Sequence, residues 1–218
     1  MSRLYNQIAG GSLNRMSGLS DGVFGFAMTV LVLDLREPIT RALDPLHLGM
    51  SGFPNEGAFL NALAGFGGPF ATFLTAFMTL GIFWVGQQTQ MESFKHADRN
   101  LTWIYIAFLS AVSLVPFTTW LLVNNHTLRS ALLVYWLNIL MLGLILLAGI
   151  LYARHIDLFK DDCKGDYKPL VNRIIYAQSL YAACAALCFI NVPLSIGGIL
   201  TVQLIYAIAP GVKLLYRL

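Results

Sequence analysis

Two carboxylates bracket the first apolar run of the chain, and they are the residues whose position could support chemistry. Asp21 and Asp34 enclose residues 22–33, a stretch of 12 residues without a charge. As a helix rising about 1.5 Å per residue, this stretch spans roughly 18 Å, whereas the hydrocarbon core of a bilayer is about 30 Å thick. If the helix crosses a membrane, at least one carboxylate lies at membrane depth. There it serves either as a proton-binding site or as a hydrogen-bonded packing node.

The composition is typical of an integral membrane protein. Hydrophobic residues make up 57% of the chain and charged residues 11%, with a mean hydropathy of +0.67. A soluble domain carries about 25% charged residues, so this chain has too few to cover a water-facing surface. The first residues lack the apolar core and cleavage site of a signal peptide. The net charge of +3 is too small to suggest a nucleic-acid partner.

Six apolar segments predict an all-α membrane protein with six transmembrane helices in one domain, residues 1–218. The segments cover residues 17–35, 59–88, 101–123, 130–153, 171–190 and 194–215. Pro69 is expected to mark a turn or kink at the start of the second segment. Pro116 lies inside the third, where neighbouring polar side chains can satisfy the carbonyl that it frees.

The distribution of basic residues predicts the orientation. With six spans and the N-terminus inside, the longest outer loop is residues 37–58, and eleven of the fourteen Lys and Arg residues fall inside. The inner set is Arg3, Arg15, Lys95, Arg99, Arg154, Lys160, Lys164, Lys168, Arg173, Lys213 and Arg217, and the outer set is Arg36, Arg41 and Arg129. Because cytoplasmic loops carry the excess of positive charge, we expect both termini in the cytoplasm.

The sequence contains no recognisable catalytic motif. It contains no Gly-rich phosphate loop, no Ser-His-Asp arrangement and no cluster of His, Cys and Glu at metal-binding spacing. Cys184 and Cys188 lie four residues apart in an apolar segment, where packing as small hydrophobic residues is the favoured interpretation. We therefore expect neither a bound metal nor a cofactor.

One face of the first helix carries a narrow stripe. At about 100° per residue, Gly22, Phe26, Thr29 and Leu33 fall within an arc of roughly 60°. Glycine and threonine at this spacing allow close helix packing, which alone would explain the stripe.

The two aspartates lie outside this stripe, about 100° away on either side. Carboxylates that lined a conduction path would share its face, so Asp21 is expected to turn toward neighbouring helices and to be hydrogen-bonded there. Ser17 and Arg15 are local candidate partners, and polar residues of other helices are further ones. Asp34, beside Arg36, is expected near the outer interface.

The first helix resembles the signature of the transmembrane protein 175 family, cation channels of bacterial and archaeal membranes and of animal lysosomes. That signature reads R-x-x-x-F-S-D, followed by an apolar stretch that ends near L-V-L-D. Arg15, Ser20 and Asp21 match it, and Leu19 replaces the phenylalanine. The six-segment layout resembles the prokaryotic form, which has one six-helix repeat per chain.

A second stretch, residues 83–122, looks like the end of the family's helix two and its helix three. Trp84 and Trp103 fall on the family's tryptophans, and Pro116, Phe117 and Thr119 match its P-F-x-T. Gln87 stands where a histidine is common.

The resemblance implies a homotetramer in which four first helices surround a central pore. The family's hydrophobic constriction falls on Phe26, where isoleucine or leucine is usual, and the next ring falls on Thr29, near which potassium would pass. Further apolar rings fall on Val30 and Leu33. The resemblance also implies a hydrogen-bond network between helices, which would here include Arg15, Ser20, Asp21, Gln87 and Trp103.

The favoured hypothesis is a potassium-permeable cation channel of a prokaryotic cell membrane, in which apolar side chains form the constriction. Selectivity for potassium over sodium should be modest, because no ring of oxygens fully replaces the hydration shell. A proton-coupled secondary transporter that uses Asp21 is the alternative, and it would typically show internal repeats and broken helices. A membrane enzyme or structural subunit is the third hypothesis.

Overall fold

The computed structural model describes residues 12–36, 56–160 and 167–208, and within them the chain is helical apart from short connections. The elements are α2 (Leu13–Val30), the 3-10 segment η1 (Leu31–Leu35), α5 (Glu56–Ala64), α6 (Gly67–Glu92), α7 (Arg99–Ser113), α8 (Val115–Asn124), α9 (Arg129–His155), α10 (Tyr167–Ala186), the 3-10 segment η3 (Leu187–Phe189) and α11 (Val192–Ile208). The all-α prediction is therefore confirmed.

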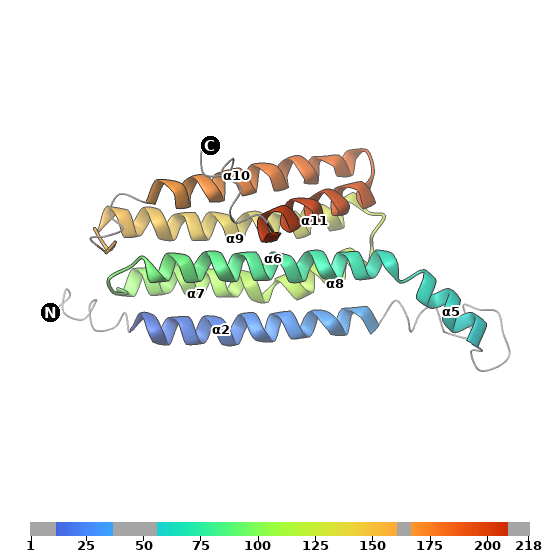
Figure 1. The fold of residues 1–218 in the computed structure, drawn as a ribbon, viewed down its shortest axis with the longest axis horizontal. Helices are drawn as coiled ribbons and strands as arrows, with labels where there is room; N and C mark the ends of the chain where they lie inside the picture. The colour runs from blue at the N-terminus through green and yellow to red at the C-terminus, as the bar shows by residue number, and fades with distance from the viewer. Residues whose placement is uncertain (1–11, 37–55, 161–166, 209–218) are drawn as a thin grey trace.

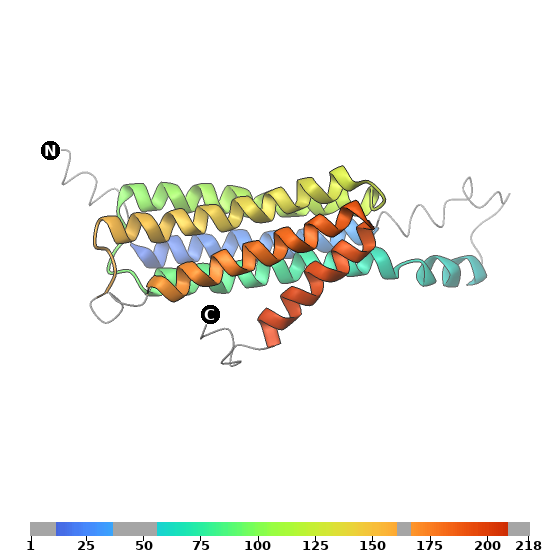
Figure 2. The same cartoon turned by 90° about the horizontal axis from the view of Figure 1, so that it is seen from above.

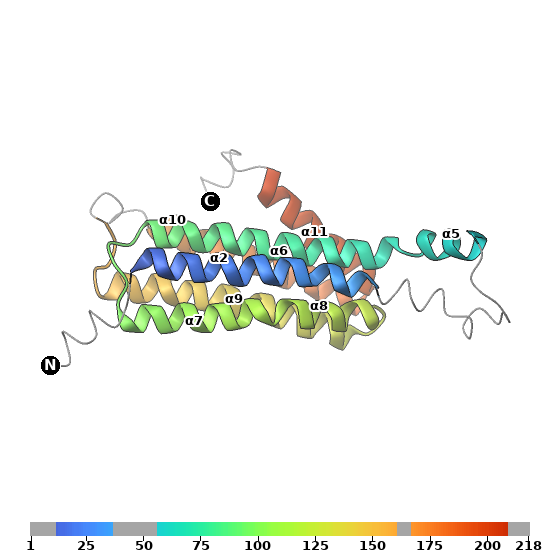
Figure 3. The ribbon, with the colours of Figure 1, turned by 90° about the horizontal axis from the view of Figure 1, so that it is seen from below.

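The helices form a bundle with α2 on one of its faces (Figure 1). Seen from below, α2 lies in front, between α6 on one side and the α7–α8 pair on the other (Figure 3). It packs against α6 and α7, and η1 continues the contact onto α8. The hairpin of α10 and α11 packs on α9 and α6, on the side of the bundle opposite α2. Helix α5 projects beyond the end of the bundle (Figure 2).

The second segment is divided into α5 and α6, although the sequence predicted one helix over 59–88. The division falls at Gly65 and Phe66, ahead of Pro69. Gly65 still donates its N–H to the carbonyl of Asn61 at 3.1 Å, which closes the last turn of α5. Pro69 lies in the first turn of α6, where the missing proline N–H breaks no hydrogen bond.

The third segment is interrupted at Leu114, between α7 and α8. Pro116 lies in the first turn of α8 and cannot continue the hydrogen-bond pattern of α7. Asn138 of α9 lies against this interruption. In the amide orientation that satisfies both groups, it donates to the carbonyl of Ala111 at 3.1 Å and accepts from the N–H of Val115 at 3.2 Å. A polar side chain of a neighbouring helix thus bridges the Ala111 carbonyl and the Val115 N–H, which an uninterrupted α-helix would pair directly.

The last two segments begin earlier than expected. The fifth, expected over 171–190, is α10 followed by the short η3, and the sixth, expected over 194–215, is α11 with Pro193 in its first turn. Residues beyond 208 lie outside the described part.

Four helical stretches in the described part are long and apolar enough to cross a membrane, namely residues 13–35, 67–92, 99–124 and 129–155. The apolar α11 has 17 residues, and α10 is more polar. Six spans therefore stay a prediction.

Aromatic packing fixes α2 against the bundle. Phe24 of α2 and Phe83 of α6 both lie beside Phe108 of α7, with ring centroids 6.0 and 6.4 Å away. All three rings are buried. Aromatic pairs of this kind add about 0.5–1.5 kcal/mol each beyond the area they bury, so the three helices share one core at this point.

Candidate pore-lining face of α2

The two faces of α2 differ sharply in burial. Phe26 and Leu33 are 72% and 67% exposed, whereas Phe24 is 2% and Leu31 0% exposed. The buried arc packs on α6, α7 and α8. The stripe derived from the sequence is therefore the face that α2 turns away from the other helices of the chain.

The other residues of the stripe are also exposed, except at its edge. Gly22 and Thr29 are exposed, and a Cβ placed at Gly22 would meet no atom within 4 Å. Val30, at the edge of the stripe, is half-buried. The hydroxyl of Thr29 donates to the carbonyl of Phe26 at 2.8 Å, which fixes its rotamer and leaves the oxygen lone pairs free to accept.

Polar side chains join the first part of α2 to the last part of α6. The Oδ1 atom of Asp21 accepts from Nε1 of Trp84 and from Nε2 of Gln88, both at 2.8 Å. Gln88 also accepts from the hydroxyl of Ser17 at 3.0 Å. The structure therefore places Asp21 in contact with a neighbouring helix, at the side of the stripe rather than on it.

A second link between the same helices lies deeper. Ser20 and Gln87 are both fully buried, and the Ser20 hydroxyl donates to Oε1 of Gln87. Of the five residues assigned to the network, Ser20, Asp21 and Gln87 meet at the α2–α6 contact. Arg15 is exposed at the start of α2, and Trp103 is 59% exposed on α7. Asp34 lies half-buried in η1.

Trp84 and Gln88 are the two partners of Asp21 that the sequence alone did not assign to the network. A usable signal was present, because residues four apart lie on one face of a helix. Gln88 and Trp84 are both within the last two turns of an apolar segment, where an indole N–H and an amide need a partner. What the sequence does not specify is which helix carries that partner.

The family model of the endosomal/lysosomal potassium channel TMEM175 matches residues 15–116. A potassium channel of Streptomyces collinus is 30% identical over 105 residues, which cover 48% of this chain and 45% of that protein. A potassium channel of Chamaesiphon minutus is 24% identical over 208 residues, which cover 89% of this chain and 93% of that protein. The chain thus matches less than half of the length of the Streptomyces protein and nearly all of the Chamaesiphon one.

A solved structure shares the fold. It is the crystal structure of a lysosomal potassium-selective channel TMEM175 homologue from Chamaesiphon minutus, with a TM-score of 0.75 at 22% identity, covering 91% of this chain and 98% of that one. The family model covers the part of the chain that contains α2, α6 and α7, in which the motif residues lie. The family is one of ion channels and not of enzymes. The resemblance carried by the first-helix motif is therefore confirmed, because residues 15–116, which contain that motif, match the model of the TMEM175 family.

Proposed function

We propose that this chain is a potassium-permeable cation channel, with both termini in the cytoplasm of a prokaryotic cell and six membrane spans per subunit. Four copies surround a central pore, and each contributes the exposed stripe of α2. The observation that carries the proposal is the exposure of Phe26 and Leu33 beside the near-complete burial of Phe24 and Leu31. The relatives that are named potassium channels support potassium as the permeant ion.

One ring of four Phe26 side chains, one from each copy, forms the constriction in this proposal. An apolar ring gates a pore by excluding water when it is narrow, and ions pass only when it stays wet. Phenylalanine is wider than the isoleucine or leucine implied by the family resemblance, so the constriction closes more readily. Val30 and Leu33 continue the apolar lining toward the outer end.

Thr29 supplies the polar ring next to this constriction. Its hydroxyl proton is held by the carbonyl of Phe26, so each subunit presents a threonine oxygen as an acceptor. Four such oxygens replace only part of the hydration shell of a cation. Potassium is therefore favoured over sodium to a modest degree, and no cofactor takes part.

A proton-coupled transporter that uses Asp21 remains the competing hypothesis. Two hydrogen bonds hold the Asp21 carboxylate against α6 rather than in the stripe. This arrangement favours a positioning role for Asp21, because a proton-coupling carboxylate has to meet the transport path.

The decisive experiment is a flux assay on the purified protein in liposomes with opposed potassium and sodium gradients, comparing wild type with Phe26→Ala. We expect cation flux to rise about tenfold, equivalent to a barrier lower by about 1.4 kcal/mol, with reduced discrimination against sodium. Phe189→Ala is the matched control, because Phe189 is a 62% exposed phenylalanine of η3, which packs with α10 and α11. Its flux should equal that of wild type.

Two results would contradict the proposal. If Phe26→Ala conducts and selects like Phe189→Ala, the constriction is not at Phe26. If the protein in a mild detergent has the mass of one chain, 24.1 kDa, rather than four times that mass, no pore can be lined by four copies of α2.

A further inference from the structure

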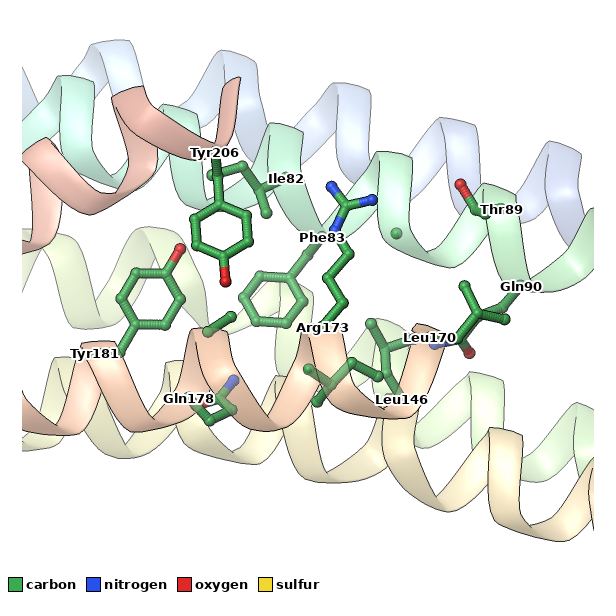
Figure 4. A pocket seen from close by; sticks show the side chains of 13 residues that line it. Ile82, Phe83, Thr89, Gln90, Leu146, Leu170, Arg173, Gln178, Tyr181 and Tyr206 are labelled. Carbon is green, nitrogen blue, oxygen red and sulfur yellow. The ribbon is translucent and has the colours of Figure 1, made fainter. Parts of the chain in front are cut away.

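A cavity of about 60 Å³ lies between α6, α9, α10 and α11, separate from the exposed stripe of α2. Its wall is largely apolar, and Figure 4 shows the contributions of Phe83, Leu146 and Leu170. Ile174 also lines it. One cationic side chain and several neutral polar ones complete the wall. The cavity is therefore amphipathic rather than a simple packing void.

Three buried polar atoms at this cavity have no hydrogen-bond partner within the described part of the chain. They are the hydroxyls of Tyr181 and Tyr206 and Oε1 of Gln178. Tyr181 is only 1% exposed, and Figure 4 shows the two hydroxyls directed into the same space. A buried polar group that lacks a partner costs about 1–3 kcal/mol, so three of them at one cavity indicate that something fills it.

The packing of α10 against α9 holds the Gln178 side chain in place. Its Nε2 donates to the carbonyl of Ile139 on α9 at 3.2 Å, and it reaches that carbonyl across Gly143. A side chain at Gly143 would occupy the space of the Gln178 amide. The amide is therefore fixed with its nitrogen on α9, and its oxygen is left as an acceptor at the cavity.

Arg173 supplies the positive charge of the cavity. It lies six residues into α10, about 9 Å from the first residue of that helix, and its side chain is exposed. Figure 4 shows it alongside Tyr206 and Phe83. No carboxylate within the described ranges forms an ion pair with it. The cavity is thus open to the outside at a cationic edge.

Helices α6 and α9 end, and α7 and α10 begin, at the same end of the bundle (Figure 1). The basic residues near these helix ends are therefore brought together there. The basic residues of this end within the described part of the chain are Arg15, Lys95, Arg99, Arg154, Lys160, Lys168 and Arg173. Anionic lipid headgroups attract such clusters with about 1 kcal/mol per basic residue near the surface. The charge of the region therefore matches an anionic membrane surface.

We propose that this cavity binds the headgroup phosphate of an anionic phospholipid, with phosphatidylglycerol as the representative ligand. The phosphate oxygens accept from the Arg173 guanidinium and from the Tyr181 and Tyr206 hydroxyls, which are all donors. A headgroup hydroxyl donates to Oε1 of Gln178. A cavity of about 60 Å³ holds a phosphate-sized group, since one water needs about 10–15 Å³ measured in this way. The acyl chains then lie outside, along the apolar surface.

The test is native mass spectrometry on the full chain, purified in a neutral detergent and titrated with phosphatidylglycerol or with phosphatidylcholine. We expect preferential retention of phosphatidylglycerol, and a loss of apparent affinity of about tenfold in Arg173→Gln. Tyr206→Phe should lose a few-fold, because one donor is removed and the ring is kept. Lys168→Gln is the matched control, since it removes an exposed positive charge from the same helix outside the cavity.

Three outcomes would overturn the proposal. Equal retention of both lipids by wild type excludes an anion site. If Arg173→Gln and Lys168→Gln lose the same apparent affinity for phosphatidylglycerol, the binding is due to general surface charge and not to the cavity. Retention of inorganic phosphate at the expense of phosphatidylglycerol, with the same dependence on Arg173, assigns the cavity to a free anion instead of a lipid. Because binding and not flux is measured, these results are independent of the channel proposal.

Discussion

Replacement of Asp21 separates its two possible roles, as a positioning residue and as a proton carrier. Asparagine keeps an acceptor oxygen where Oδ1 lies, and it can still receive the hydrogen bonds of Trp84 and Gln88. It has no titratable proton. Alanine removes both the acceptor and the proton. A positioning role therefore predicts that Asp21→Asn behaves almost like wild type and that Asp21→Ala does not.

The expected magnitude follows from the two 2.8 Å hydrogen bonds. A hydrogen bond to a charged group contributes about 1.5–3 kcal/mol to stability, whereas bonds between membrane helices average only about 0.6 kcal/mol. Because Asp21 is exposed in the subunit, the lower figure is the better guide. Loss of both bonds should thus cost about 1–2 kcal/mol in Asp21→Ala, and less than about 1 kcal/mol in Asp21→Asn. Trp84→Phe, which removes one donor, should fall between them.

Two measurements on the same samples complete the test. Thermal unfolding in lipid gives the order of stability, and potassium flux in liposomes is recorded with and without a proton gradient. We expect Asp21→Asn to keep its flux, with no requirement for the gradient. If Asp21→Asn is folded and tetrameric but passes no ion, and wild-type flux depends on the gradient, Asp21 is a proton site and the positioning argument fails. If Asp21→Ala is as stable as wild type, the bonds to α6 do not anchor α2.

Two further substitutions test the helix contacts. Gly143→Ala should displace the Gln178 amide from Ile139 and lower stability by about 1 kcal/mol, most of which the double variant with Gln178→Ala should recover. Gly86→Ala is the control in thermal unfolding, because it has the same gain in helix propensity and its Cβ meets no atom within 4 Å. Asn138→Leu should cost about 1–3 kcal/mol, because it leaves the helix interruption before Pro116 without its compensating amide. An unfolding midpoint like that of wild type would exclude this compensation.

The grouping of side chains on one face of the first helix could be predicted from the sequence, because it depends only on helical geometry. Angles of about 100° per residue placed Phe26, Thr29 and Leu33 together and set Val30 at the edge. The structure exposes the first three and half-buries Val30. The same geometry put Asp21 off the stripe, and it is hydrogen-bonded to a neighbouring helix. Their roles in a pore stay a prediction.

The helix interruptions and the tertiary partners could not be located in the same way. A proline excludes a backbone hydrogen bond at a position known from the sequence. The helix is interrupted, however, where a side chain of another helix can bond the backbone groups left unpaired. Here that side chain is Asn138. The division before α6 falls at Gly65 and Phe66 rather than at Pro69, because the first turn of a helix tolerates proline. Such choices depend on contacts between segments, which spacing along one segment does not contain.

In the proposed channel, the rotation of α2 about its own axis determines which side chains line the pore. A rotation by one residue, about 100°, would remove Phe26 and Thr29 from the axis. Two features oppose this rotation at different depths. The links of Ser20 and Asp21 to α6 hold the inner part of the helix, and Leu31, fully buried against neighbouring helices, holds the outer part. In this proposal, residues that do not touch the ion therefore determine which side chains line the pore, and the polar motif residues and the apolar stripe act together on one helix.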